Sequence, residues 1–454
     1  MQRFLNVFHI DEEVDVHVAF ETMNNRGLQL SNLELLKNRL IYLTTKLGES
    51  QSNIEMTRKN INDCWKTVYY FLGKNPKKSL NDDYLLFVHF VIYFGPKALE
   101  ITPKLFESGF HLVHNHEYYK DYLLEQEFNV KRIYAERSED RLTSTALLNY
   151  SLDLKKVAEN FYALSFPQDS KYSEDVKLWL ERLKRLRGVS HSREVMIATL
   201  FFLPQFKDES ARLKFLELIE KYFFICYLLP YNFLRKNKFI IIAEEMVKLV
   251  TKKTCLDDFT KILESELDKW QKNPDFKVAI LDGFGESAYY SWKDVKYFLF
   301  EYELNLKIKS KRKTDKIVWD DFLENDFGED HASVEHILPQ TTTFQYWKDA
   351  LQGLDSKKSK KLKNSLGNLV AISLPRNSSL RNKPFPDKKG NKDLKTGYLF
   401  GSYSENEIAL SNDWGPREIL ERGIRLLEFL ELRWSIDLGS HKDKKKLLGL
   451  EFLS

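Results

Sequence analysis

Apolar residues recur every three or four positions through most of the middle of the chain, the spacing that places them on one face of an α-helix. The clearest examples are Trp65, Val68, Tyr69 and Leu72, and then Phe259, Ile262, Leu263, Leu267 and Trp270. Large aromatic residues in such stripes are typical of a hydrophobic core. The pattern therefore predicts consecutive helices over residues 46–275.

A different pattern appears near the N-terminus, where residues 14–18 alternate between apolar and polar, as in a half-buried strand. A glycine-containing loop follows. Ser31 then precedes a helix predicted from Asn32 to Leu43, and Glu34 lies three residues after Ser31. This is the capping-box spacing, in which each side chain bonds the backbone N–H of the other residue.

The last third of the chain contains two short apolar segments separated by a long basic stretch, which is expected to be a loop. Ser333 to Ile337 is predicted as a first strand and Asn368 to Ile372 as a second. Pro375 then opens a helix, at the position where its missing N–H costs least. The predicted fold class is mainly α, with a small ββα module in the C-terminal third.

Four polar residues fall at the ends of these elements, namely Glu335, His336, Asn368 and Asn377. A neutral imidazole at His336 can take a proton from water near neutral pH. The carboxylate of Glu335 and the amide oxygen of Asn377 are hard oxygen ligands, suited to Mg²⁺ or Mn²⁺. Asn368 is placed either to tie down the basic stretch or to hold the His336 side chain. The set indicates metal-assisted hydrolysis of a phosphodiester.

At these residues the chain resembles the HNH endonucleases, which have a ββα-metal fold. Glu335-His336-Ile337 with Pro339-Gln340 is similar to the first-strand motif of that family, although many members carry Asp in place of Glu335. A narrower resemblance, over roughly the last third of the chain, is to the C-terminal nuclease domain of GmrSD-type modification-dependent restriction enzymes. The residues that carry it are Leu366, Gly367, Asn368, Leu369, Asn377, Leu380, Asn382, Phe385, Lys388 and Trp414.

The resemblance implies catalytic roles for His336 and Asn368 and metal ligation by Glu335 and Asn377. It also implies foreign DNA as substrate, with phage DNA and modified DNA as the main cases. Two of these residues also have purely structural interpretations. His336 can be a strand-end histidine that bonds a backbone carbonyl, and Asn377 can be a helix N-cap.

Local charge agrees with a phosphate-bearing partner. Residues 341–400 contain 13 Lys and Arg against 4 Asp and no Glu, whereas the formal net charge of the whole chain is only +4. Such a patch gathers phosphates in a salt-dependent way. The expected DNA contacts are Arg376, Arg381, Lys383 and Lys388. The run from Lys357 to Lys363 is either a further contact or a solvated loop.

The segment from Phe20 to Ser31, with Arg26 at its centre, resembles the end of the ParB-like, NTP-handling domain of GmrSD-type enzymes. The Asp-Gly-Gln-Gln-Arg stretch of that domain occurs nowhere in this sequence, so nucleotide-binding residues stay unassigned. Either a separate subunit supplies the missing half or the chain is a truncated version. The expected domains are residues 1–45 as a ParB-like remnant, 46–275 as a helical domain and 276–454 as the nuclease domain, with its ββα core at about 333–390.

Other features narrow the class of protein. Three cysteines, Cys64, Cys226 and Cys255, form no CxxC pair, so neither a disulfide framework nor a structural zinc is indicated. His111, His114 and His116 fit no zinc spacing and are interpreted as surface loop residues. No apolar run approaches the ~20 residues of a membrane span, and no signal peptide is recognised. We therefore expect a cytoplasmic protein.

Two functions follow from the sequence. The first is a Mg²⁺- or Mn²⁺-dependent DNA endonuclease of an anti-phage restriction system, with RNA cleavage as a weaker variant of the same chemistry. The second is a non-catalytic DNA-binding or sensor subunit of a split defence complex. Because one such module cuts one strand, a double-strand break needs two sites or two molecules, which makes a homo-oligomer one expected assembly.

Overall fold

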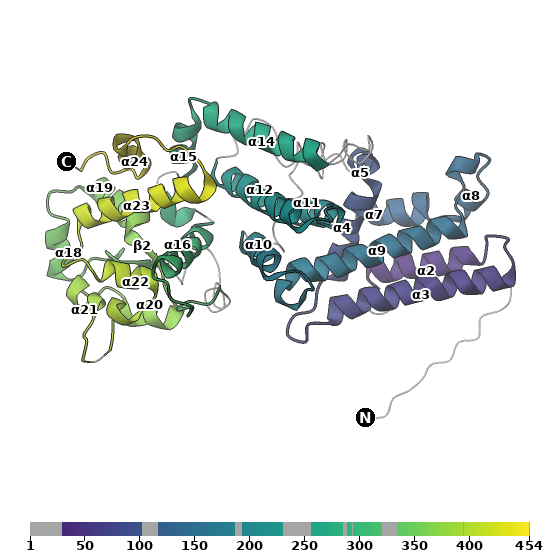
Figure 1. The fold of residues 1–454 in the computed structure, drawn as a ribbon, viewed down its shortest axis with the longest axis horizontal. Helices are drawn as coiled ribbons and strands as arrows, with labels where there is room; N and C mark the ends of the chain where they lie inside the picture. Colours follow the sequence, from purple (N-terminus) through teal and green to yellow (C-terminus); the bar gives the residue numbers. More distant parts are fainter. Residues whose placement is uncertain are drawn as a thin grey trace. The chain divides into compact units, whose positions relative to one another are not determined.

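The computed structural model describes residues 30–101, 117–186, 193–229, 256–284, 288–292, 294–319, 334–393 and 395–453. The predicted strand at residues 14–18, the loop around Arg26 and the three histidines at positions 111, 114 and 116 lie outside these ranges. The described residues are mainly helical and include a small two-stranded sheet, as the sequence pattern predicted (Figure 1).

The chain divides into two compact units. One comprises Met1–Lys184, Gly188–Ile219 and Lys236–Lys261, and the other comprises Arg185–Arg187, Glu220–Arg235 and Ile262–Ser454. Two long helices, α12 (Glu209–Leu228) and α14 (Leu256–Lys272), contribute residues to both units.

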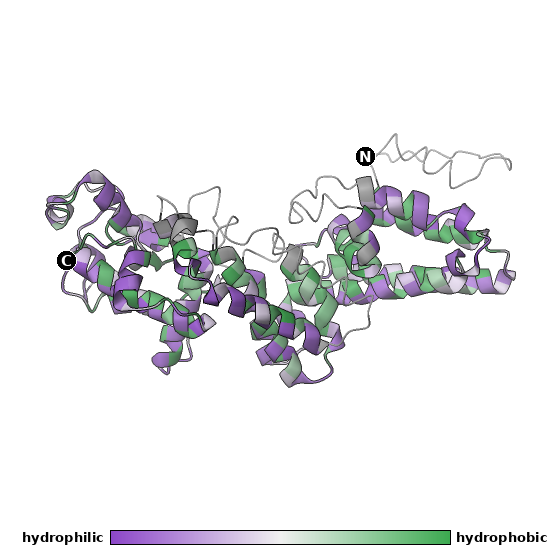
Figure 2. Ribbon diagram, turned by 90° about the horizontal axis from the view of Figure 1, so that it is seen from above, coloured by the Kyte–Doolittle hydropathy of each residue, from purple (hydrophilic) through white to green (hydrophobic). Residues whose placement is uncertain are grey.

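The first unit is a stack of helices around an aromatic-rich core. Its helices are α2 (Asn32–Thr44), α3 (Gln51–Gly73), α4 (Asp82–Phe94), α5 (Pro96–Ile101), α7 (Glu117–Asp121), α8 (Val130–Ile133), α9 (Ser144–Ser165), α10 (Glu174–Arg185) and α11 (Arg193–Phe202). α3 packs along α9, and α2 contacts both α3 and α4 (Figure 1). Trp65, Val68 and Leu72, which the helical spacing placed on one face, are buried. Figure 2 shows hydrophobic and hydrophilic residues on different sides of these helices.

The start of α2 confirms the predicted capping box. The Ser31 hydroxyl accepts a hydrogen bond from the Glu34 backbone N–H at 3.3 Å. The Glu34 carboxylate in turn accepts one from the Ser31 backbone N–H, also at 3.3 Å. Two N–H groups that a helix start would otherwise leave unpaired are thereby satisfied.

The second unit contains the ββα module. After α15 (Phe276–Phe284) and α16 (Val295–Lys309), its elements are β1 (Val334–His336), α18 (Gln345–Ala350), α19 (Ser356–Asn364), β2 (Leu369–Ala371), α20 (Leu374–Leu380), α21 (Phe385–Lys389), α22 (Tyr403–Ile408), α23 (Pro416–Trp434) and α24 (His441–Leu447). β1 and β2 are antiparallel, with Val334 opposite Ala371 and His336 opposite Leu369. The predicted order of strand, strand and helix is therefore present, with each strand shorter than expected.

The basic stretch between the strands was expected to be a loop, and this expectation is wrong. It contains α18 and α19, because each helix has a buried apolar residue and α19 has a polar cap. Trp347 of α18 and Leu362 of α19 are fully buried. The Asp355 carboxylate caps α19 by accepting from the Lys358 backbone N–H at 2.8 Å.

The sheet is held against α23 by a glycine and an arginine. A Cβ atom at Gly367 would lie 1.9 Å from the carbonyl oxygen of Ile419 in α23, so only glycine allows this close approach. The buried Arg422 side chain of α23 donates to the carbonyl oxygens of Gly367 at 2.9 Å and Leu369 at 2.7 Å. α16 and α22 contact β2 as well. These contacts give the strands a rigid support.

The cysteines and the lengths of the apolar helices bear on the expected class of protein. Cys64 and Cys226 are buried free thiols, while Cys255 lies outside the described ranges. None of the helices that the structure describes is both long and apolar enough to cross a membrane.

Candidate active site

His336 lies at the end of β1 and exposes only 8% of its surface. Its Nε2 is 3.2 Å from Asn364 Oδ1 and 3.3 Å from Gln340 Nε2, and its ring lies 4.4 Å from that of Tyr290. Nε2 cannot serve both amides at once, since it donates to Asn364 only when protonated and accepts from Gln340 only when unprotonated. The Gln340 contact therefore matches the tautomer that can accept a proton from water at Nε2.

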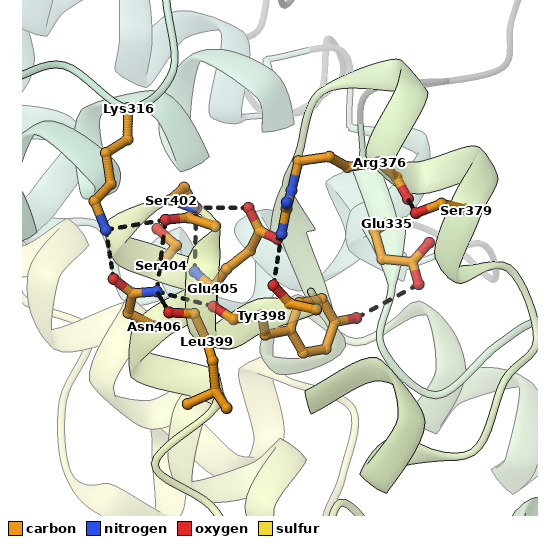
Figure 3. Close-up of polar contacts among 12 residues, drawn as sticks. Lys316, Glu335, Arg376, Ser379, Tyr398, Leu399, Ser402, Ser404, Glu405 and Asn406 are labelled. Atoms are coloured by element: carbon orange, nitrogen blue, oxygen red, sulfur yellow. Dashed lines mark hydrogen bonds and ion pairs between the residues drawn. The ribbon is translucent and has the colours of Figure 1, made fainter. Parts of the chain in front are cut away.

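Glu335 precedes His336 in β1 and has different side-chain partners. Its carboxylate is 5% exposed and pairs with Lys388. The Tyr398 hydroxyl contacts the same carboxylate (Figure 3). Both contacts fall on Oε1, with the Tyr398 hydroxyl donating over 3.5 Å. Burial raises the pKa of Glu335 to about 7, and the positive charge of Lys388 opposes this rise.

Lys388 does not have the position expected of a DNA contact. Its side chain is fully buried. Its ammonium group donates to the Glu335 carboxylate and to the backbone carbonyls of His336 at 3.1 Å and Ile337 at 3.0 Å. Burial lowers the pKa of Lys388, and Glu335 opposes that shift. The ammonium is thus an internal cation that holds the end of β1, and its burial corrects the expectation of a DNA contact at this residue.

Asn368 is fully buried at the start of β2. Its Oδ1 accepts from the Leu338 backbone N–H at 2.8 Å and from Trp414 Nε1 at 3.2 Å. Its Nδ2 donates to the carbonyl oxygens of Leu338 at 2.8 Å and Lys363 at 2.7 Å. The amide therefore joins the beginning and the end of the stretch between the strands. The sequence suggested two roles for Asn368, and these contacts match the one in which it holds the basic stretch in place.

Asn377 lies inside α20 and is half-buried. Because the N-cap of this helix is Ser373, the alternative in which Asn377 caps the helix is wrong. The proline prediction is confirmed, since Pro375 lies in the first turn of α20. Asn377 is thus carried by a helix that directly follows β2.

Arg376 links α20 to the surroundings of Glu335. Its guanidinium pairs with Glu405 at 2.5 Å and donates to the carbonyl oxygen of Gly397 at 2.8 Å. Tyr398, the residue after Gly397, is the one that reaches Glu335 (Figure 3). The ion pair with Glu405 fixes the helix that bears Asn377, and the Arg376 side chain remains 33% exposed.

The two remaining basic candidates follow the end of α20. Arg381 and Lys383 are both exposed. Arg381 has a positive φ of 43°, a conformation uncommon for a residue with a side chain. Its Nε donates to the carbonyl oxygen of Ser378 at 2.9 Å. These two side chains are positioned at the surface, where a phosphate contact is sterically possible.

Three residues around the site had no signal in the sequence motifs. Asn364 and Tyr290 contact His336, and Tyr398 contacts Glu335. Tyr290 and Tyr398 are far from β1 along the chain, so only the fold brings them to it. The buried position of Lys388 did have a signal, because it lies three residues after the buried Phe385, on the same face of α21.

The Glu335 carboxylate is a hard oxygen donor of the kind that Mg²⁺ takes. Among the described residues, no cluster of three or more His, Cys, Asp or Glu could enclose a metal ion. Mg²⁺ does not require one, since it keeps several waters and binds through one or two carboxylates and substrate phosphate. The described hydrogen bonds of Glu335 fall on Oε1 and leave Oε2 for a ligand bond. Asn377 supplies an amide oxygen of the same hard character.

Comparison with known proteins identifies the region in which these residues lie. Residues 270–429 match the family model described as GmrSD restriction endonucleases, C-terminal domain. No curated protein and no solved structure matches the chain. The matched region contains β1, β2 and α20 with Glu335, His336, Asn368 and Asn377. This part of the chain is therefore similar to the C-terminal domain of the GmrSD restriction endonucleases, which suggests a nuclease of the restriction type.

Proposed function

We propose that this chain is an HNH-type DNA endonuclease that depends on Mg²⁺ or Mn²⁺ and hydrolyses phosphodiester bonds. The observation that carries the proposal is the position of His336 within the matched nuclease region. It stands at the end of a strand that is braced on both sides, and its Nε2 faces the amides of Asn364 and Gln340. A strand-end imidazole with an accessible unprotonated tautomer is a suitable general base.

In the proposed reaction, His336 Nε2 takes a proton from a water molecule as the water oxygen attacks phosphorus. The bond from phosphorus to the leaving ribose oxygen breaks, and that oxygen takes up a proton from solvent. Glu335 Oε2 and the Asn377 amide oxygen would hold the cation. A bound Mg²⁺ or Mn²⁺ polarises the phosphate and offsets negative charge on the leaving oxygen.

The remaining side chains position these groups. Lys388 holds Glu335 Oε1 together with the carbonyls of His336 and Ile337. Asn368 holds both backbone groups of Leu338. The backbone on each side of the His336 side chain is therefore fixed, which keeps the imidazole in one orientation before substrate binds. We assign Asn368 a positioning role on this basis.

The family description names restriction endonucleases, and we extend the proposal to the restriction of foreign DNA in the cytoplasm, with phage DNA and modified DNA as substrates. One site cuts one strand, so cleavage of a duplex requires two copies of the chain or two encounters. A separate subunit with the Asp-Gly-Gln-Gln-Arg stretch is the proposed partner for nucleotide handling.

The test is a plasmid-nicking assay with Mg²⁺ or Mn²⁺ and with a chelator. We compare the wild-type protein with His336→Ala and with His441→Ala, which changes an exposed histidine of the same unit. Loss of the general base lowers the rate by about 10²–10⁴-fold, whereas His441→Ala leaves it unchanged. Folded wild-type protein that retards DNA without nicking it would instead establish the non-catalytic DNA-binding subunit.

A further inference from the structure

Helix α19 concentrates positive charge beside the candidate active site. Its nine residues, Ser356–Asn364, include five lysines and no acidic residue. Lys357, Lys358 and Lys360 are exposed, and Lys361 is partly exposed. We call these four residues the α19 lysine face.

The charge of this face is poorly compensated compared with that of another lysine-bearing helix. In α14, Lys261, Lys269 and Lys272 each pair with an acidic residue three or four positions earlier. In the described part of the chain, the α19 lysine face forms one such pair, between Lys358 and Asp355 at 3.6 Å. Lysines three or four positions apart on a helix repel one another, and a polyanion lying along the face would relieve that repulsion.

The end of α19 is fastened to the residues around His336. Asn364, its last residue, lies 3.2 Å from His336 Nε2. Lys363 Nζ donates to the carbonyl oxygen of Gln340 at 2.8 Å, and Leu362 is fully buried. Counting back from Asn364 at 1.5 Å per residue, the lysine face begins about 5 Å along the helix axis and extends to about 10 Å. The near end of the face is therefore within about two nucleotide rises of Asn364, at about 3.4 Å per rise on one strand.

The basic surface continues onto the C-terminal segment. A Cβ atom at Gly449, just after α24, would lie 3.9 Å from Lys361 Cδ. The ammonium of Lys358 lies 5.9 Å from the ring centre of Phe452. Lys442 and Lys446 of α24 are exposed as well. The lysines of α19 are thus part of a wider positive surface.

We propose that the α19 lysine face is the surface that binds the DNA backbone beside the scissile phosphate. This inference rests on the proposed nuclease function and names the surface that holds the substrate. The lysines act as charges on phosphates, so they contribute affinity that depends on salt and carries no base preference. The buried Leu362 and the bond from Lys363 to Gln340 set the register between the bound backbone and His336.

The experiment measures binding of a fluorescently labelled DNA duplex by anisotropy over a series of salt concentrations. All proteins carry His336→Ala so that the duplex stays intact. The test variant is Lys357→Gln, Lys360→Gln, Lys361→Gln, and the matched control is Lys261→Gln, Lys269→Gln, Lys272→Gln. Both remove three charges from exposed helix surfaces. Because each phosphate contact adds about 0.9 to the slope of log K against log salt, the test variant should lose about 2–3 in slope while the control keeps it.

A third variant, with arginine at positions 357, 360 and 361, should retain the slope because it retains the charge. Thermal unfolding of each protein checks that the fold is intact, and Lys360→Gln alone, with an expected slope loss of about 1, serves if the triple variant does not fold. Equal slopes for test variant and control overturn the assignment of the surface. That result is distinct from failure of the nuclease proposal, which the nicking assay with unmodified His336 reports separately.

Discussion

The ammonium group of Lys388 lies inside the protein against the carboxylate of Glu335, with the carbonyls of His336 and Ile337 as its other acceptors. Lys388→Met removes one member of this buried pair and leaves the Glu335 carboxylate without its counter-charge. We expect the free energy of unfolding to fall by about 3–5 kcal/mol. A urea unfolding curve measures the change.

Two further variants separate loss of the pair from loss of the lysine itself. Glu335→Gln combined with Lys388→Met should be less destabilised than Lys388→Met alone, because no uncompensated charge is left. Lys383→Met, at an exposed position nearby, should stay within about 0.5 kcal/mol of wild type. If the loss of stability in the double variant equals the sum of the losses in Glu335→Gln and Lys388→Met, the two charges are not coupled.

The close contact at Gly367 predicts a strong effect of a single methyl group. In Gly367→Ala the new Cβ would meet the backbone of Ile419 and Gly423, neither of which can rotate away. The loss should exceed about 3 kcal/mol or prevent folding of the second unit. Gly73→Ala is the control, since a Cβ at that helix position meets nothing within 4 Å. Thermal unfolding of both variants compares them directly.

The two amide partners of His336 predict opposite effects on turnover. Gln340→Ala removes the donor that favours unprotonated Nε2, so kcat should fall by about 2–10-fold, the worth of one hydrogen bond. Asn364→Ala removes the acceptor that favours protonated Nε2 and should leave kcat unchanged or raised. The ¹⁵N shifts of the imidazole report the tautomer in each protein. A larger loss for Asn364→Ala than for Gln340→Ala would contradict this assignment.

A buried lysine in α16 predicts a dependence of stability on pH. Burial lowers the pKa of Lys296 from 10.5 to about 8. Below that value the amine is protonated in both the folded and the unfolded protein, and its burial costs stability in full. Between about 8 and 10.5 the unfolded chain binds the proton more strongly than the folded one, so the cost shrinks as pH rises.

Lys296→Met should therefore raise the free energy of unfolding at pH 7 by roughly 1–3 kcal/mol. The gain over wild type should decrease steadily towards pH 10. Lys309→Met, at an exposed position of the same helix, should show little difference at either pH. Urea unfolding of the three proteins over this pH range gives the comparison, and a constant gain would exclude titration of Lys296 as its cause.

Local patterns were enough to predict some of the fold. The Ser31–Glu34 pair located the start of α2, because a capping box acts within four residues. The order of β1, β2 and α20 followed from two short apolar segments and one proline. α18 and α19 were missed because each is held to the core by one buried apolar residue, Trp347 or Leu362, which shows no periodic pattern in the sequence.

The side-chain partners were harder to predict, for a physical reason. Lys388 and Arg376 are basic residues of the kind that contact phosphate. Lys388 nevertheless pairs with Glu335, 53 positions away, and Arg376 pairs with Glu405, 29 positions away. Charge density along a chain shows how many cations a segment has. It does not show which of them the folded protein uses internally, since that depends on tertiary contacts.

The amide of Asn368 closes the stretch between β1 and β2 at its base, by bonding Leu338 at one end and Lys363 at the other. Because Asn368 holds both ends of this stretch, we expect that residues in its middle, such as those around Gly353, can be inserted, deleted or exchanged without separating the two strands. The length and charge of this stretch can then be changed by mutation while the backbone next to His336 keeps its support.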